Sequence, residues 1–221
     1  MFFHLAWSGN NNLTDGSLSD QLQNVEILSN AISIAKKVGC TKFFNIGTSE
    51  EYFVAENLKN WQNKPNSLKY YGLSKLTSYY YAQILTYLNK IDIIHIRFSA
   101  VVNSLSSEFE DKGFIFSNMT KMKKGEPIDQ ILNNQLFDFI ETSELVDAII
   151  KLATIGVNKE EYYIGPNYPL KIEEFLNLIK MELMGNDYSN YLNENTLDYY
   201  DNDLYVSKTG DMMKFNAKKF I

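Results

Sequence analysis

Two short groups of residues in this sequence could carry out chemistry together: Tyr71 with Lys75, and Thr48-Ser49-Glu50 upstream. A tyrosine and a lysine four positions apart share one face of a helix, so we expect the ammonium to lie close to the phenol. A nearby positive charge favours the phenolate and lowers the tyrosine pKa from its usual value of about 10. Such a phenol can take a proton from a hydroxyl, or return it, while a hydride leaves the same carbon.

The elements that must position these residues alternate along the first hundred positions. Short apolar runs and longer segments with helical spacing of apolar residues predict strands at 2–7, 42–46 and 91–98 and helices at 21–38 and 71–89. Gly39 suits the end of the first helix. Residues 50–69 are predicted to form a loop. The strand–helix order predicts a parallel sheet with right-handed crossovers.

The pattern changes after Asn103, where shorter elements predict a smaller α/β lobe. The predicted helices and strands of this part lie at 113–124, 136–140, 143–153, 162–165 and 172–183. The tail 186–221 is rich in Asn, Asp and Tyr and is left unassigned.

Composition excludes several classes of protein. The chain has 221 residues, 45% of them apolar, which is enough for a hydrophobic core. Its net charge of −6 argues against a nucleic-acid binder. The single cysteine, Cys40, excludes an intrachain disulfide and suggests a reducing, cytoplasmic compartment. We expect no signal peptide, because the apolar start is short and lacks a basic region, and no membrane span, because no apolar run approaches about 20 residues. We expect no metal site, because His4, His95 and Cys40 are the only nitrogen or sulfur ligands.

Several segments, in order, match motifs of one known family. The segment His4-Leu5-Ala6-Trp7 resembles its H-L-A-A strand, and Thr48 to Tyr52 resembles the end of its S-S/T-x-x-V-Y-G motif. Tyr71-x-x-x-Lys75 begins 23 residues after Thr48, a separation typical of the family. Segments at 138–148 and 162–165 resemble its D-F-I-Y-V-D-D-L-V-D-A and Y-N-I-G segments. The chain therefore resembles the extended short-chain dehydrogenase/reductases, the NAD-dependent sugar-nucleotide epimerase/dehydratase group.

The resemblance implies an α/β fold, a truncated doubly wound parallel (Rossmann-type) sheet with a smaller α/β substrate lobe. Residues 1–103 would be the C-terminal portion of the NAD(P)-binding domain, and 104–185 mostly the substrate-binding lobe. Within that lobe, residues 137–153 are expected to return to the main sheet. The resemblance also implies a homodimer that pairs through the helices at 21–38 and 71–89. The dimer contact would include Tyr79, Tyr81 and Tyr87, unless these tyrosines belong to the core.

The glycine-rich turn that holds a dinucleotide pyrophosphate in such folds is missing from the sequence. We interpret the chain as starting inside the fold, without about 60 residues, or two βαβ units. The alternative is a shorter protein that never binds a dinucleotide by itself. The cofactor, NAD or NADP, is chosen by a strand that the sequence lacks.

The family's catalytic roles transfer to four positions. Tyr71 would be the general acid/base, Lys75 would lower its pKa and bind the nicotinamide ribose, and Thr48 would bind the reacting hydroxyl. Glu50, from a Thr-Ser-Glu triplet like that of GDP-mannose 4,6-dehydratase-like enzymes, would remove the sugar C5 proton. The structural alternatives are a core tyrosine, a solvated lysine, a turn-capping threonine and a solvated acid like Glu51.

The remaining contacts are less specific. Ala6 and Trp7 would line the cofactor, Trp7 being equally suited to the core. Ser49 and Arg97 would contact the nucleotide-activated sugar, although a structural ion pair is the other role for Arg97. Both histidines are interpreted as core residues. The reaction stays open between 4,6-dehydratase, 4-epimerase and keto-reductase, and a non-catalytic remnant or partner subunit is the rival to all three.

Overall fold

The computed structural model describes residues 1–8, 17–59, 70–98, 100–103, 114–129, 136–165 and 168–185. Within it the chain forms two compact units. The first contains residues 1–98 and 151–162, and the second contains residues 99–150 and those from 163 on.

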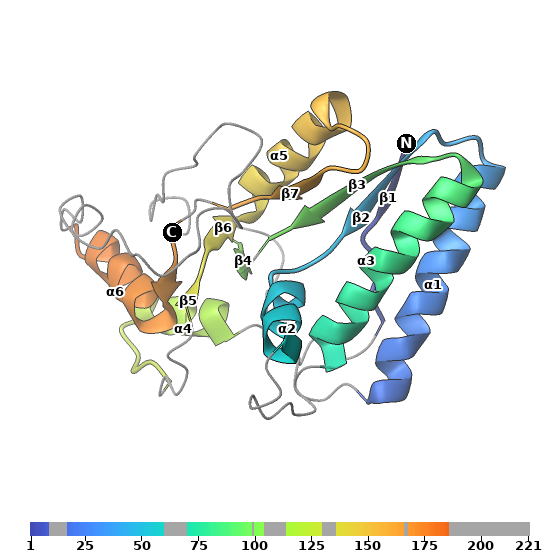
Figure 1. The fold of residues 1–221 in the computed structure, drawn as a ribbon. Coiled ribbons are helices and arrows are strands. Elements are labelled where there is room, and N and C mark those ends of the chain that lie inside the picture. The colour runs from blue at the N-terminus through green and yellow to red at the C-terminus, as the bar shows by residue number, and fades with distance from the viewer. Residues whose placement is uncertain are drawn as a thin grey trace. The chain divides into compact units, whose positions relative to one another are not determined.

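The first unit is built on a four-stranded sheet in the order β1-β2-β3-β7 (Figure 1). The strands are β1 (Phe2–His4), β2 (Lys42–Ile46), β3 (Asp92–Arg97) and β7 (Glu161–Tyr163). β1, β2 and β3 run parallel, and Asn45 of β2 lies directly opposite His95 of β3. The predicted parallel sheet is confirmed. The first strand is shorter than predicted, since only three of its residues pair.

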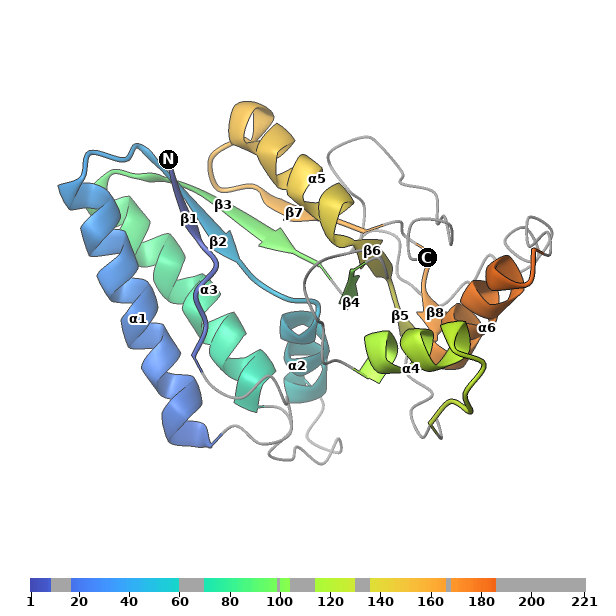
Figure 2. The same cartoon turned by 180° about the vertical axis from the view of Figure 1, so that it is seen from behind.

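Two long helices, α1 (Leu18–Lys37) and α3 (Tyr70–Asn89), lie side by side on one face of this sheet (Figures 1 and 2). Ser17 caps α1 by accepting a hydrogen bond from the Asp20 amide, and Gly39 follows the helix at φ +74°. The core between them and the sheet consists of Leu28, Ala31, Ile32, Ala35, Phe43, Ala82, Ile91 and Ile93. Of the three tyrosines considered for a dimer contact, Tyr81 and Tyr87 are exposed whereas Tyr79 is buried.

One helix was not expected. Residues Glu50–Lys59 form α2, where the sequence predicts a loop; residues 60–69 lie outside the described part of the chain. Glu50 and Glu51 occupy its first turn, where carboxylates complement the positive end of the helix dipole. The Glu50 amide donates to Thr48 Oγ1 at 3.4 Å, which caps this end. The apolar spacing of the segment is too weak to reveal the helix; its buried Val54 packs against α3.

The second unit contains two small sheets and two packed helices. β4 (Ala100–Val102) pairs parallel with β6 (Phe139–Glu141), and β5 (Leu136–Phe137) pairs antiparallel with β8 (Leu170–Lys171). α4 (Phe114–Lys123) and α6 (Ile172–Leu183) complete it, and α5 (Thr142–Ile155) follows β6. The core residues are Val102, Met119, Phe139, Leu170, Phe175, Leu176, Leu178 and Ile179.

Asp138 explains why the strand predicted at 136–140 is two strands. Its buried carboxylate accepts hydrogen bonds from the Tyr163 hydroxyl at 2.9 Å and the Tyr168 amide at 2.7 Å. Its carbonyl accepts from the Ala100 amide at 2.9 Å. The chain therefore changes partner at this residue, from β8 on one side to β4 on the other. The predicted tail at 186–221 lies outside the described residues.

Candidate active site

Thr48 lies in the short loop between β2 and α2, at the carboxyl end of the strand. Two backbone hydrogen bonds tie this loop to the end of β3: the Gly47 amide donates to the Ile96 carbonyl at 2.7 Å, and the Ser49 amide donates to the Phe98 carbonyl at 3.1 Å. The carboxyl ends of parallel strands are where open α/β sheets bind ligands. The predicted location of Thr48 is confirmed.

Tyr71 lies in the first turn of α3 and forms a side-chain hydrogen bond with Thr48. The next residue, Gly72, allows this approach because a Cβ there would lie 2.7 Å from Val54 Cγ2 and 2.9 Å from the Glu50 carbonyl oxygen. The structure thus brings together the two side chains that the sequence pairs, across the packed starts of α2 and α3.

The pKa of Tyr71 shifts in the direction opposite to the sequence-based expectation. This pKa is raised from 10.0 to about 12: burial is the largest cause, the hydrogen bond with Thr48 opposes it, and the charges of Glu51 and Glu50 add to it. Lys75 is not among its causes, because the ammonium lies 5.9 Å from the Tyr71 ring centroid and is directed elsewhere. The prediction of a phenol held partly ionised by Lys75 is wrong for this arrangement.

The Lys75 ammonium is held by two other groups. It donates to the Ile46 carbonyl at 3.0 Å and lies 3.9 Å from the centroid of the Trp7 ring. Burial lowers the pKa of Lys75 to about 8, and the charge of Glu51 opposes that shift. Lys75 is buried, so the alternative of a solvated helix lysine is excluded.

Trp7 and Ala6 follow β1, beside this pair. The Trp7 indole N–H donates to Gln21 Oε1 at 3.1 Å, and its ring meets the Tyr71 ring edge-on at 5.9 Å between centroids. Trp7 is half-buried and Ala6 exposed. Trp7 therefore covers the Lys75 side of the site.

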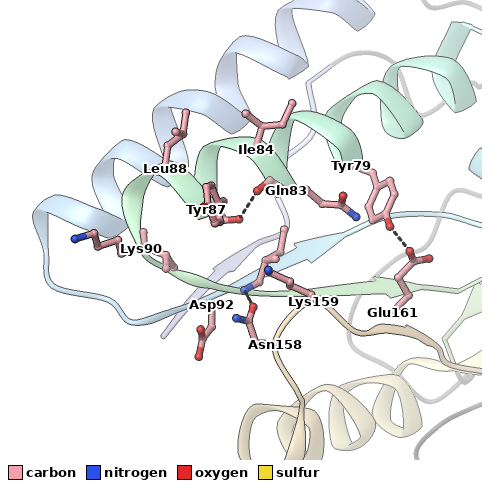
Figure 3. Close-up of a pocket in the computed structure, with 13 residues that line it drawn as sticks. Tyr79, Gln83, Ile84, Tyr87, Leu88, Lys90, Asp92, Asn158, Lys159 and Glu161 are labelled. Carbon is pink, nitrogen blue, oxygen red and sulfur yellow. Dashed lines mark hydrogen bonds between the residues drawn. The ribbon is translucent and has the colours of Figure 1, made fainter.

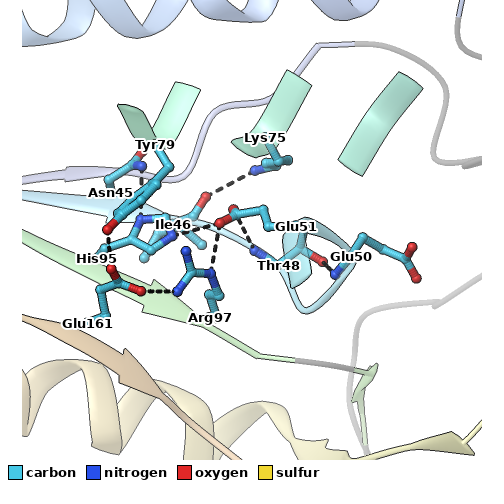
Figure 4. Close-up of polar contacts among 10 residues, drawn as sticks. All are labelled: Asn45, Ile46, Thr48, Glu50, Glu51, Lys75, Tyr79, His95, Arg97 and Glu161. Atoms are coloured by element: carbon cyan, nitrogen blue, oxygen red, sulfur yellow. Dashed lines mark hydrogen bonds and ion pairs between the residues drawn. The ribbon is translucent and has the colours of Figure 1, made fainter. Parts of the chain in front are cut away.

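The residues assigned to substrate differ in their surroundings. Ser49 is a buried residue of the loop between β2 and α2. The Glu50 side chain points away from the buried polar groups (Figure 4). Arg97 is bound to two carboxylates: its Nε donates to Glu51 Oε2 at 2.8 Å, and its Nη1 donates to Glu161. These contacts are those of the structural ion pair that the sequence left as the alternative role.

Sequence reasoning missed a buried polar cluster below Thr48, shown in Figure 4, which we call the Glu51 cluster. Its members are Asn45, Glu51, Tyr79, His95, Arg97 and Glu161. One signal could have revealed it. His95 and Arg97 are two apart in an otherwise apolar strand, so they share one face and need polar or acidic partners there.

The large groove in the first unit is not this site. A space of about 930 Å³ lies along the end of α3 and the starts of β3 and β7, lined among others by Gln83, Tyr87, Asp92 and Lys159 (Figure 3). It opens at the amino ends of the strands, away from Thr48, and extends along α3 to Tyr79 and Glu161 of the Glu51 cluster. Among the described residues, no group of three potential metal ligands occurs, and no helix is both long and apolar enough to span a membrane.

Solved structures share this fold at low sequence identity. The enzyme WbmG of Bordetella bronchiseptica, in complex with NAD and UDP, aligns with a TM-score of 0.59 and 18% identity, covering 84% of this chain and 56% of WbmG. UDP-N-acetylglucosamine 4-epimerase from Bacillus cereus aligns with a TM-score of 0.62 and 17% identity, covering 80% and 61%. UDP-glucose 4-epimerase from Thermotoga maritima, with UDP-glucose, gives 0.63 and 18%, covering 84% and 62%. The chain thus spans about three fifths of these proteins.

The sequence comparison identifies the family. No curated protein matches the chain significantly. The family model described as the NAD dependent epimerase/dehydratase family matches residues 1–165, three quarters of the sequence, and confirms the resemblance drawn from the motifs. The chain belongs to the NAD dependent epimerase/dehydratase family.

Proposed function

We propose that this chain supplies the acid/base site of an enzyme that modifies a nucleotide-activated sugar with NAD or NADP. The observation that carries the proposal is the hydrogen bond between Thr48 and Tyr71, with Lys75 buried one helical turn away. WbmG and the UDP-glucose 4-epimerase are described in complex with UDP and with UDP-glucose, which supports this substrate class.

Tyr71 would exchange a proton with the oxygen on sugar C4, and Thr48 would orient that oxygen. With a pKa of about 12, Tyr71 is protonated at neutral pH, so it is ready to donate a proton to a 4-keto oxygen. To accept a proton instead, it needs a cation closer than Lys75 lies now. The bound cofactor would exchange the hydride with the same carbon.

The residues present fit one end of the dinucleotide only. Lys75, Ala6 and Trp7 would lie at the nicotinamide ribose, and Lys75 offers the ammonium donors that ribose hydroxyls accept. No glycine-rich phosphate turn occurs in these 221 residues. The chain's own affinity for dinucleotide is therefore expected to be weak.

The role of Glu50 would distinguish the reaction types. As the first residue of α2, half-exposed and directed away from the Glu51 cluster, it takes no part in the ion pairs that join Glu51 to His95 and Arg97. We propose it as the base that removes the C5 proton if the enzyme is a 4,6-dehydratase. Glu50→Gln should then abolish the 4-keto-6-deoxy product, whereas an epimerase or keto-reductase would keep its product.

A non-catalytic partner subunit is the second candidate, and one observation favours it. Lys75 is committed to the Ile46 carbonyl and the Trp7 ring, so among the described residues no cation supports the Tyr71 phenolate. A chain that only packs against a catalytic partner would tolerate this arrangement.

We also propose a homodimer through α1 and α3. A groove of about 470 Å³ between these helices is lined by Leu22, Val25, Glu26, Ser29, Thr77, Tyr81 and Leu85. Leu22 in this lining is 51% exposed, and Ile84 and Leu88 elsewhere on α3 are also more than half exposed. We further propose that residues 104–185 form most of the substrate-binding lobe. We also propose that the protein is located in the cytoplasm.

Titration of the purified chain with NAD(H) and NADP(H) tests the enzymatic proposal. Saturable binding up to millimolar cofactor, followed by turnover of a UDP- or GDP-sugar, supports it. No binding at that concentration would instead favour the partner subunit.

A further inference from the structure

Glu51 is a carboxylate in an unusual place, with a side chain that is 1% exposed. Its Oε1 accepts the Thr48 amide at 3.1 Å, and its Oε2 accepts His95 Nε2 at 3.0 Å and Arg97 Nε at 2.8 Å. Burying a charge without partners is expensive, so all three donors are needed to retain it. The pKa of Glu51 is lowered by His95 and Arg97 despite the opposing effect of burial, so it is ionised at neutral pH.

The surroundings hold this carboxylate in one orientation. Asn45 Nδ2 lies 3.0 Å from His95 Nδ1, which leaves Nε2 of His95 to carry the proton that Glu51 accepts. Glu161 binds the other side of Arg97. Gly47 packs directly against these two side chains and leaves no room for a side chain of its own, since a Cβ there would lie 2.3 Å from Glu51 Oε1 and 2.6 Å from His95 Nε2.

Within the described part of the chain, the Thr48 amide is the main-chain donor that reaches this carboxylate. Its side-chain hydroxyl accepts from the Glu50 amide and is hydrogen-bonded with Tyr71. Fixing the Thr48 backbone therefore fixes where its hydroxyl lies relative to the phenol.

We propose that Glu51 is a positioning residue that holds Thr48 against Tyr71 through the Thr48 main-chain amide. The inference rests on the proposed function for its catalytic consequence, but the contact itself is independent of it. The competing role is a counter-ion for Arg97 alone, in which case Thr48 would stay in place without Glu51.

Substitution by glutamine separates the two roles, because it keeps volume and removes one acceptor. Three donors point at the Glu51 carboxylate, but Gln offers a single oxygen and an NH₂ group that is itself a donor. In Glu51→Gln the oxygen is expected to stay with Arg97, the charged donor, so the NH₂ group would face the Thr48 amide. Glu51→Asp keeps the charge but draws the carboxylate back by one methylene.

The test is amide hydrogen exchange at Thr48 by NMR in the whole chain. Both variants are expected to speed exchange at Thr48 by about tenfold, the equivalent of one ordinary hydrogen bond. Glu161→Gln is the matched control: it removes the other carboxylate on Arg97 without touching Thr48, and should leave Thr48 exchange unchanged. Unchanged Thr48 exchange in both Glu51 variants would overturn the proposal.

Two further readouts keep the result decisive. If the variants do not fold, the wild-type chain decides: a slowly exchanging Thr48 amide supports the proposal, and one that exchanges at the rate of an unstructured chain refutes it. If the chain turns over a nucleotide-sugar, Glu51→Gln should lower kcat by about 10- to 100-fold with KM nearly unchanged. Failure of cofactor binding would remove the proposed function but leave the exchange result standing.

Discussion

The Lys75 ammonium lies 3.9 Å from the centroid of the Trp7 indole and 5.9 Å from that of the Tyr71 ring. The lysine therefore contacts the face of the tryptophan and leaves the phenol unsupported. The family strand that Trp7 resembles has alanine at this position, which offers no aromatic face. We therefore predict that Trp7 controls the pKa of Tyr71 by holding the Lys75 ammonium.

Replacing Trp7 should release that cation. In Trp7→Ala we expect the pKa of Tyr71 to fall below its value of about 12, because the ammonium can approach the phenol. The measurement is an NMR pH titration of ring-labelled tyrosine, with Tyr71→Phe to assign the signal. Trp7→Phe keeps an aromatic face and should leave the pKa nearly unchanged. A titration identical in Trp7→Ala and wild type would show that Trp7 does not hold Lys75.

Lys75 should make stability depend on pH. Its pKa is about 8 in the folded chain and 10.5 in the reference state, so below pH 8 the folded state bears the cost of a buried ammonium. Between pH 8 and 10.5 the folded state has released its proton while the unfolded state keeps it, and stability rises. Lys75→Met should therefore be more stable than wild type at pH 7, by about 1–3 kcal/mol. The difference should shrink toward pH 10.5.

Urea unfolding at several pH values between 7 and 10 measures this effect. Lys37→Met, at an exposed position in the last turn of α1, serves as the control and should show no such trend. A Lys75→Met difference that is constant with pH would contradict the prediction.

Tyr71→Phe removes the proposed acid/base group and one hydrogen bond. Any turnover of a nucleotide-sugar should fall by about 10²–10⁴-fold, while the free energy of unfolding changes by about 1 kcal/mol. Tyr70→Phe removes the hydroxyl of the preceding residue on α3 and should retain activity. Equal rates in both variants would remove Tyr71 from the chemistry.

The α1–α3 face should mediate self-association. Leu22 and Tyr81 line the groove between these helices and are 51% and 50% exposed. Leu22→Glu places a charge at the centre of that surface and should convert a dimer into a monomer, as measured by light scattering after size exclusion. Ile150→Glu changes a residue of α5 that is also exposed and should leave the mass unchanged. A monomeric wild-type chain would refute the dimer.

Periodicity predicted the long elements because their apolar residues face a core. The helix predicted at 172–183 and the strand at 42–46 agree with the structure to the residue. β4, β8 and α2 were not predicted. Two or three residues are too few to show a period, and α2 packs on α3 through Val54 without a continuous apolar stripe in its sequence.

The sequence predicted that Thr48 and Tyr71 lie close together, but it did not predict the electrostatics around them. Spacing placed Thr48 near Tyr71, since a strand end and a helix start must meet there. It could not show that Trp7, distant in sequence, would take the Lys75 ammonium, or that Glu51 would be buried while Glu50 beside it stays accessible. Such choices depend on packing between elements, which one sequence leaves open.

The alignment of Asn45 with His95 also has a consequence for how the chain folds. Sliding β3 by one residue along β2 would turn His95 and Arg97 to the opposite side of the sheet and leave Glu51 as a bare charge in an apolar interior. Without these contacts, two strands composed mostly of Phe and Ile could pair in more than one register. The ionic contacts of His95 and Arg97 with Glu51 thus favour the native register over one shifted by a residue.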